Sequence, residues 1–82
     1  MPKNWHHFSA REHTAFLLAH GFRFVHTKGS HEFYFKRTDG IPHLVQVVLH
    51  AEEARQSRKT MDMSVRHSGI SRDEYKRWIN EK

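Results

Sequence analysis

The chain contains no cysteine, and only two prolines and four glycines stand among its 82 residues. Without cysteine, neither a disulfide framework nor a thiolate zinc site can form, which is compatible with the reducing cytoplasm. No apolar run approaches the ~20 residues that a membrane-spanning helix needs, and the longest, 44–49, is interrupted by Gln46. The residues from Met1 to His7 lack the apolar segment of a secretory signal peptide, so we expect a cytoplasmic protein that does not enter a membrane.

The chain has more basic than acidic side chains and is rich in histidine. Fourteen Lys and Arg side chains stand against nine Asp and Glu, and nine histidines add positive charge as the pH falls. A basic surface attracts polyanions, of which RNA and DNA are the commonest in a cytoplasm, although solubility alone is the other reason for such charge. The length allows one small domain with a thin core, which we take to span 1–82.

The hydrophobic pattern predicts an α+β domain with the element order α-β-β-β-α-α, in which helices pack on one face of a three-stranded antiparallel sheet. Helical periodicity and capping residues indicate three helices: 10–20, 57–67 and a short amphipathic segment after Ser71. Alternation of apolar and polar residues indicates three strands: 22–27, 30–36 and 43–50. Tight turns are expected at Lys28-Gly29 and at Thr38-Asp39-Gly40.

The first hairpin predicts which side chains share a face of the sheet. If the chain turns on Lys28-Gly29 alone, His26 lies directly opposite His31, whereas a longer loop separates the two rings. That register gives a core-facing stripe of phenylalanines: Phe22, Phe24, Phe33 and Phe35. The opposite face, which includes Tyr34, is largely polar. Because the third strand runs antiparallel to the second, His50 is expected at the same end of the sheet as His31.

His31 is the strongest candidate for chemistry. It stands directly after the tight turn and opens an aromatic strand, where a side chain is held rigidly and stays accessible. Imidazole titrates near neutral pH, so one ring can accept the proton of a ribose 2′-hydroxyl while another protonates the leaving 5′ oxygen, which cleaves RNA without a metal. Support is expected from residues near the same end of the sheet: His26, His50 and Lys28.

Phosphate contacts are expected in two places. Lys28 and the backbone amides around Gly29 and Ser30 can stabilise the negative charge that builds on a phosphate. Arg58 and Lys59 stand at the beginning of the second predicted helix, whose free amides also attract phosphate. An ordinary solvated helix face is the alternative explanation for these two basic residues.

Several other interpretations are open for the same residues. A histidine after a turn is often only a surface residue. A metal site made by His26, His31 and His50 is a rival, but its spacing matches no standard zinc pattern and no supporting carboxylates stand beside it, so we expect no metal and no cofactor. A module that binds RNA or protein without cutting is another alternative. A DNA-binding regulator is weaker, because the sheet separates the helices that a helix-turn-helix would need.

One arrangement of short motifs resembles a family of bacterial toxins. Gly21-Phe22 is followed by Lys28-Gly29-Ser30-His31 with Tyr34 three residues on, and later by Lys59-Thr60-Met61 and Ser68-Gly69-Ile70-Ser71. With the terminal amphipathic helix, this order resembles the HicA toxins of type II toxin–antitoxin systems. The similarity extends over the core of the chain, about residues 9–79, and the glycine–serine–histidine element is its specific part.

The resemblance implies a fold and an activity. The fold would be similar to a double-stranded-RNA-binding domain. The activity would be that of a ribosome-independent mRNA interferase, an endoribonuclease that inhibits translation and needs no metal. The catalytic histidine of the family falls on His31. The implied partners are an mRNA substrate and a HicB-type antitoxin protein that covers the site, and the toxin alone is expected to be a monomer.

Overall fold

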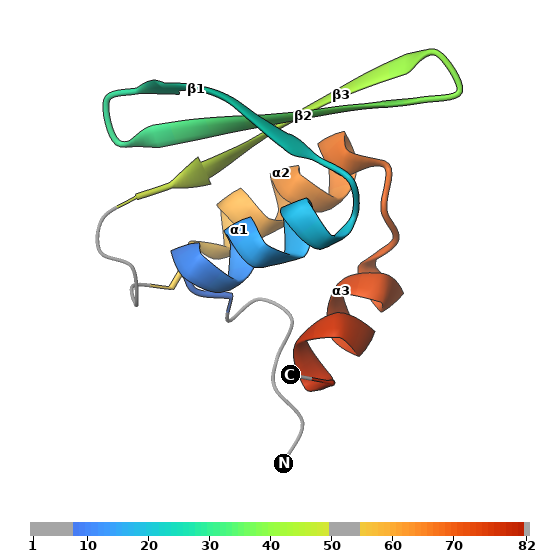
Figure 1. Cartoon of the computed structure of the whole chain (residues 1–82). Coiled ribbons are helices and arrows are strands. Elements are labelled where there is room, and N and C mark those ends of the chain that lie inside the picture. Colours follow the sequence, from blue (N-terminus) through green and yellow to red (C-terminus); the bar gives the residue numbers. More distant parts are fainter. Residues whose placement is uncertain (1–7, 50–54, 82) are drawn as a thin grey trace.

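The computed structural model describes residues 8–49 and 55–81. Its elements follow in the order α1 (Ala10–Ala19), β1 (Arg23–Lys28), β2 (His31–Thr38), β3 (Ile41–Val48), α2 (Arg58–Ser68) and α3 (Arg72–Asn80). The strands form one antiparallel sheet in the order β1-β2-β3. Figure 1 shows the three helices on the same side of this sheet. The predicted α+β architecture, with its element order and its antiparallel sheet, is confirmed.

A serine stands at the N-cap of each helix. The hydroxyl of Ser9 accepts a hydrogen bond from the amide of Glu12 at 3.1 Å, and the Glu12 carboxylate accepts one from the Ser9 amide at 2.9 Å. This is the predicted capping box, which satisfies two amides that a helix start leaves without partners. The hydroxyls of Ser57 and Ser71 cap α2 and α3 through the amide three residues later.

The core lies between the helices and the inner face of the sheet. Its largest fully buried hydrophobic side chains come from Phe8 and from α1, β3, α2 and α3: Phe8, Phe16, Leu17, Val45, Val47, Met61, Tyr75 and Ile79. Each such side chain stabilises the fold by about 1.5–3 kcal/mol relative to full exposure. The packing leaves the outer face of the sheet without a helix in the described part of the chain (Figure 1).

The first hairpin turns one residue later than predicted. The turn consists of Gly29 and the serine after it, so that Lys28 pairs with His31 and His26 pairs with Phe33. Gly29 has a φ of 60°, a conformation that glycine adopts freely and lysine only with strain. The prediction that His26 lies directly opposite His31 is therefore wrong.

The core-facing aromatic residue of β2 is Tyr34, and the predicted phenylalanine stripe is also wrong. Tyr34 is 4% exposed and pairs with the buried Val45 of β3. Of the four phenylalanines only Phe22 is buried, whereas Phe24 is 50% exposed. The other two are half-buried and alternate with Tyr34, which places them toward the outer face: Phe33 and Phe35. The β1–β2 pairing shifts by one residue between Phe24 and His26, so that Phe24 lies opposite Tyr34 and the phenylalanines of the two strands do not share one face.

The second hairpin turns at Asp39 and Gly40, within the predicted Thr38-Asp39-Gly40 turn. From there β2 and β3 pair without interruption, from Thr38 opposite Ile41 to His31 opposite Val48. The continuous ladder places β3 at one edge of the sheet, and α2 packs against this strand. The geometry of the site described below depends on this pairing.

Gly69 ends α2 with a left-handed backbone, φ 74°, close to a histidine of β3. A Cβ atom on Gly69 would lie 2.7 Å from Cε1 of His43, whose Nδ1 is hydrogen-bonded to the carbonyl of His67 at 3.0 Å. We expect Gly69→Ala to lower the free energy of unfolding by about 2 kcal/mol, because strain and displacement of the ring add. Gly29→Ala is the matched control: its φ is also positive, but nothing lies within 4 Å of the new Cβ.

The control variant is expected to lose about 1 kcal/mol, the cost of the left-handed conformation alone. Urea unfolding of both variants at pH 7 measures the difference. Equal losses at Gly69 and Gly29 would show that the contact with His43 contributes nothing.

Candidate active site beside helix α2

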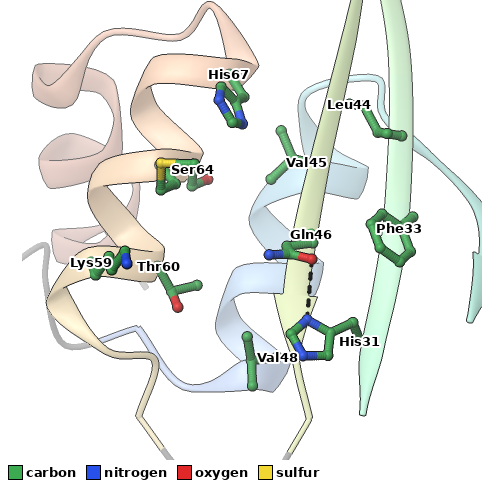
Figure 2. A pocket seen from close by; sticks show the side chains of 11 residues that line it. His31, Phe33, Leu44, Val45, Gln46, Val48, Lys59, Thr60, Ser64 and His67 are labelled. Carbon is green, nitrogen blue, oxygen red and sulfur yellow. Dashed lines mark hydrogen bonds between the residues drawn. The ribbon is translucent and has the colours of Figure 1, made fainter. Parts of the chain in front are cut away.

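A cavity of about 400 Å³ lies between α2 and the β3 edge of the sheet. From the sheet, its walls are formed by side chains of β2 and β3: His31, Phe33, Leu44, Gln46 and Val48. From the helix they are formed by Lys59, Thr60, Met63 and His67. Figure 2 shows α2 on one side of the cavity and the two strands on the other. The walls are mainly apolar, with imidazole rings and a lysine as the groups that can carry charge.

Strand pairing brings two polar side chains of the sheet together. His31 pairs with Val48 and Gln46 pairs with Phe33, so His31 and Gln46 are diagonal neighbours on the outer face. Nδ1 of His31 is hydrogen-bonded to Oε1 of Gln46 at 3.1 Å. Figure 2 shows this bond and the second ring nitrogen of His31, which is directed away from Gln46.

The imidazole of His31 is accessible from solvent. The residue is half-buried and is not one of the fully buried residues of the core. The backbone on both sides of the ring is held by the strand pairing of β2. A fixed ring that a ligand can still reach is the requirement for acid–base chemistry on a bound substrate.

Two of the predicted supporting residues lie on the same face as His31. Lys28 is its direct partner across the β1–β2 pair, where opposed Cβ atoms are ~5 Å apart. His26 is a diagonal neighbour, and its ring stacks on Phe33 with centroids 4.6 Å apart and an interplanar angle of 15°. The third predicted supporter, His50, lies outside the described residues.

The predicted phosphate-binding residues divide between several places. Gly29 and Ser30 form the exposed turn next to His31. Lys59 lines the cavity, whereas Arg58 lines a separate polar cleft with Asp62, Arg66 and Arg72. Neighbouring residues of a helix point about 100° apart, which is why two adjacent basic side chains reach different surfaces. Of the predicted helix pair, only Lys59 is brought to the same cavity as His31.

A buried histidine beneath the cavity is a residue that the sequence analysis missed. His13 is 0% exposed. Its Nε2 is hydrogen-bonded to the hydroxyl of Ser64 at 2.9 Å, and its Nδ1 lies 3.5 Å from Oε1 of Gln56. Ser64 lines the cavity and is also bonded to the hydroxyl of Tyr75 at 2.6 Å. This network links the cavity to the core.

Burial lowers the pKa of His13 from 6.5 to about 4, against the opposing effect of the hydrogen bond with Gln56. The ring is therefore neutral at pH 7, with Nδ1–H donated to Gln56 and Nε2 accepting from Ser64. The sequence contained a signal for the burial of His13. The residue stands three positions from both Ala10 and Phe16, on the apolar face of the predicted helix.

Gln56 fixes the end of β3. Its amide nitrogen donates to the carbonyl of Val48 at 2.8 Å, and its amide oxygen accepts from the Val48 backbone N–H at 3.0 Å. The Gln56 amide thus forms the two backbone hydrogen bonds that a neighbouring strand would form at this edge of β3. Because Val48 pairs with His31, this contact holds the strand that forms one wall of the cavity.

Within residues 8–49 and 55–81, no group of three His, Asp or Glu side chains is arranged to hold a metal ion. The rival metal interpretation included His50, which falls outside these ranges. None of the helices described by the structure has both the length and the apolar character that a bilayer crossing requires.

The described geometry combines a reachable imidazole, an amide that holds it, and cationic side chains from β1 and α2. No family model matches the chain, and no curated protein or solved structure matches it either. The chemistry of the cavity is therefore the physical basis on which a function can be assigned.

Proposed function

We propose that the protein is a metal-independent endoribonuclease of the HicA toxin type, with His31 as its catalytic residue. The observation that carries the proposal is the placement of the His31 ring: half-buried, hydrogen-bonded to Gln46, and at the wall of a cavity of about 400 Å³. Cavities of about 300–1,000 Å³ accept small-molecule groups, which include a nucleoside. The motif resemblance to HicA toxins falls on the same histidine.

In the proposed reaction, Nε2 of His31 takes the proton of a ribose 2′-hydroxyl, and the 2′ oxygen attacks the neighbouring phosphorus. The bond between phosphorus and the 5′ oxygen breaks, and the 5′ oxygen receives a proton. The products are a 2′,3′-cyclic phosphate and a 5′-hydroxyl. His26 is the proposed proton donor, because it is a diagonal neighbour of His31 on the same face. Each proton transfer contributes about 10²–10⁴-fold to the rate.

Positive charge supports this reaction from two directions. Lys28 stands opposite His31 on β1, and Lys59 lines the cavity from α2. In the proposed reaction both ammonium groups stabilise the charge that develops on the phosphate. The formal net charge of the chain, +5, favours association with RNA over a long range.

The proposed fold type and partners follow from the same interpretation. A three-stranded antiparallel sheet with helices on one side supports a domain similar to a double-stranded-RNA-binding domain. Leu44 and Met63 line the cavity and are 48% and 38% exposed, a surface suited to a HicB-type antitoxin that covers the site. We propose a cytoplasmic monomer that cleaves mRNA and inhibits translation until this antitoxin binds.

The test is incubation of the purified protein with a single-stranded RNA in EDTA. We expect cleavage that leaves a 2′,3′-cyclic phosphate, because the proposed chemistry uses no metal. The matched substrate carries one 2′-deoxyribose at the cleavage position and is expected to stay intact there. Binding of RNA without cleavage would contradict the nuclease and support a binding module of the same fold.

A further inference from the structure

The side-chain amide of Gln46 contacts the imidazole ring of His31, with Oε1 of Gln46 3.1 Å from Nδ1 of His31. We propose that Gln46 is a positioning residue, whose carbonyl oxygen accepts the Nδ1–H of His31 and leaves the Nε2 lone pair directed away from it. The inference rests on the proposed function, because it assigns His31 the role of proton acceptor in the free enzyme.

The first support is the polarity of the two contacting atoms. Oε1 of Gln46 lies 3.1 Å from Nδ1 of His31, and a carbonyl oxygen can only accept a hydrogen bond. Nδ1 must therefore carry the proton in this contact. Neutral imidazole has one N–H, so Nε2 keeps its lone pair. Figure 2 shows the amide nitrogen of Gln46 on the side of α2, away from the ring.

The second support is the sequence of β3. Side chains at alternate positions of a strand share a face, and Leu44 and Val48 accompany Gln46 on the outer face of β3. Both neighbours are apolar, and Val48 is the direct partner of His31. Within the described part of the chain, Gln46 is the one side chain that is hydrogen-bonded to the His31 ring.

The contact has a consequence for the reaction. When Nε2 takes the substrate proton, the ring becomes a cation whose Nδ1–H still points at the Gln46 carbonyl. A hydrogen bond from a charged donor is about twice as strong as a neutral one, so the contact stabilises the protonated ring more than the neutral ring. With the amide reversed, Nε2 would carry the proton at the start and His31 would begin as a donor.

The tautomer can be measured without any substrate. Long-range ¹⁵N–¹H NMR spectra of the parent chain, recorded at pH 8.5, distinguish a protonated Nδ1 from a protonated Nε2. We expect the Nδ1–H form in the parent chain and in Leu44→Met, which alters the same face of β3 without removing the amide. In Gln46→Met, which keeps the side-chain length but lacks the acceptor, we expect the Nε2–H form to predominate.

The kinetic test uses RNA cleavage by the same variants. Gln46→Met is expected to lower kcat about tenfold with KM unchanged, the effect of losing one orienting hydrogen bond of about 1.4 kcal/mol. Gln46→Glu keeps an acceptor and is expected to restore the Nδ1–H form. Its carboxylate should move the acidic limb of the pH–rate profile of the variant to higher pH, because a negative charge favours the protonated form of a neighbouring imidazole.

The results separate this inference from the function on which it rests. An Nε2–H ring in the parent chain would overturn the role of Gln46, even if RNA is cleaved. Unchanged kcat and pH profile in Gln46→Met would also overturn it. An Nδ1–H ring in a parent chain that cleaves no RNA would support the contact with Gln46 and reject the nuclease.

Discussion

Replacement of His31 by alanine is expected to lower the single-turnover rate of RNA cleavage by about 10²–10⁴-fold, the contribution of one acid–base group. The variant should remain folded, because the His31 side chain is half-buried at the cavity and does not belong to the buried core. Expression of the parent chain is expected to arrest bacterial growth, and expression of His31→Ala is expected to allow growth.

His43 provides the matched control. It is a histidine of β3 that does not line the cavity and is bonded instead to the carbonyl of His67. His43→Asn should therefore cleave RNA at the parent rate. Added imidazole should partly restore cleavage by His31→Ala, because a free base can occupy the space that the ring leaves. Full activity of the alanine variant would remove His31 from the mechanism.

Acidification from pH 6.5 to 4 is expected to remove about 3 kcal/mol from the free energy of unfolding through His13 alone. Burial lowers the pKa of His13 in the folded chain to about 4, whereas the unfolded side chain has its ordinary value of 6.5. Between these values the unfolded chain binds a proton that the folded chain excludes, so lower pH favours unfolding. Well above pH 6.5 the ring is neutral in both states, and the contribution of His13 is complete.

The loss is large for a domain of this size, whose total stability is of the order of 5–15 kcal/mol. Urea unfolding of the parent chain and of His13→Gln at pH 7 and at pH 4.5 isolates it. The glutamine variant should be less stable at pH 7, since it disturbs the network with Ser64, but should lose less stability on acidification. His26→Gln, which alters an exposed histidine, should behave like the parent chain.

Other groups also titrate in this experiment. Hydrogen bonds from Arg77 and His20 lower the pKa of the Glu74 carboxyl, so its contribution is likewise lost as the pH falls. The loss of stability through Glu74 is common to the parent chain and both variants. The difference between the stability losses of the parent chain and of His13→Gln therefore measures the contribution of His13. If both chains lose the same stability between pH 7 and pH 4.5, the neutral state of His13 is not what acid disrupts.

The predictions that succeeded concern local structure. The helix expected over 10–20 is observed at Ala10–Ala19, and its capping box forms as the spacing of Ser9 and Glu12 indicates. The Asp39–Gly40 turn is also observed where it was expected. In each case the contacts join residues within about four positions, so the chain segment contains all the partners it needs.

The prediction of the first hairpin failed through a difference of one residue. The interpretation placed Lys28 within the turn, but Gly29 takes the left-handed position and the serine after it completes the turn. The predicted stripe failed for a second reason, because the β1–β2 pairing shifts by one residue between Phe24 and His26. Phe24 therefore lies opposite the buried Tyr34, whereas Phe33 lies opposite His26. The sequence contains aromatic residues at both alternations, so composition alone could not choose between them.

The choice of His31 needed only the sequence, because it depends on one turn, one strand and the residue type at their junction. Gln46 and Lys59 are separated from His31 by 15 and 28 positions, and only tertiary structure brings them to one cavity. Register decides which residue of β3 stands beside the ring, and the packing of α2 on β3 decides which of two adjacent basic side chains reaches it. Both depend on the burial of apolar surface between distant segments, and a shift of one residue in a strand reverses the outcome.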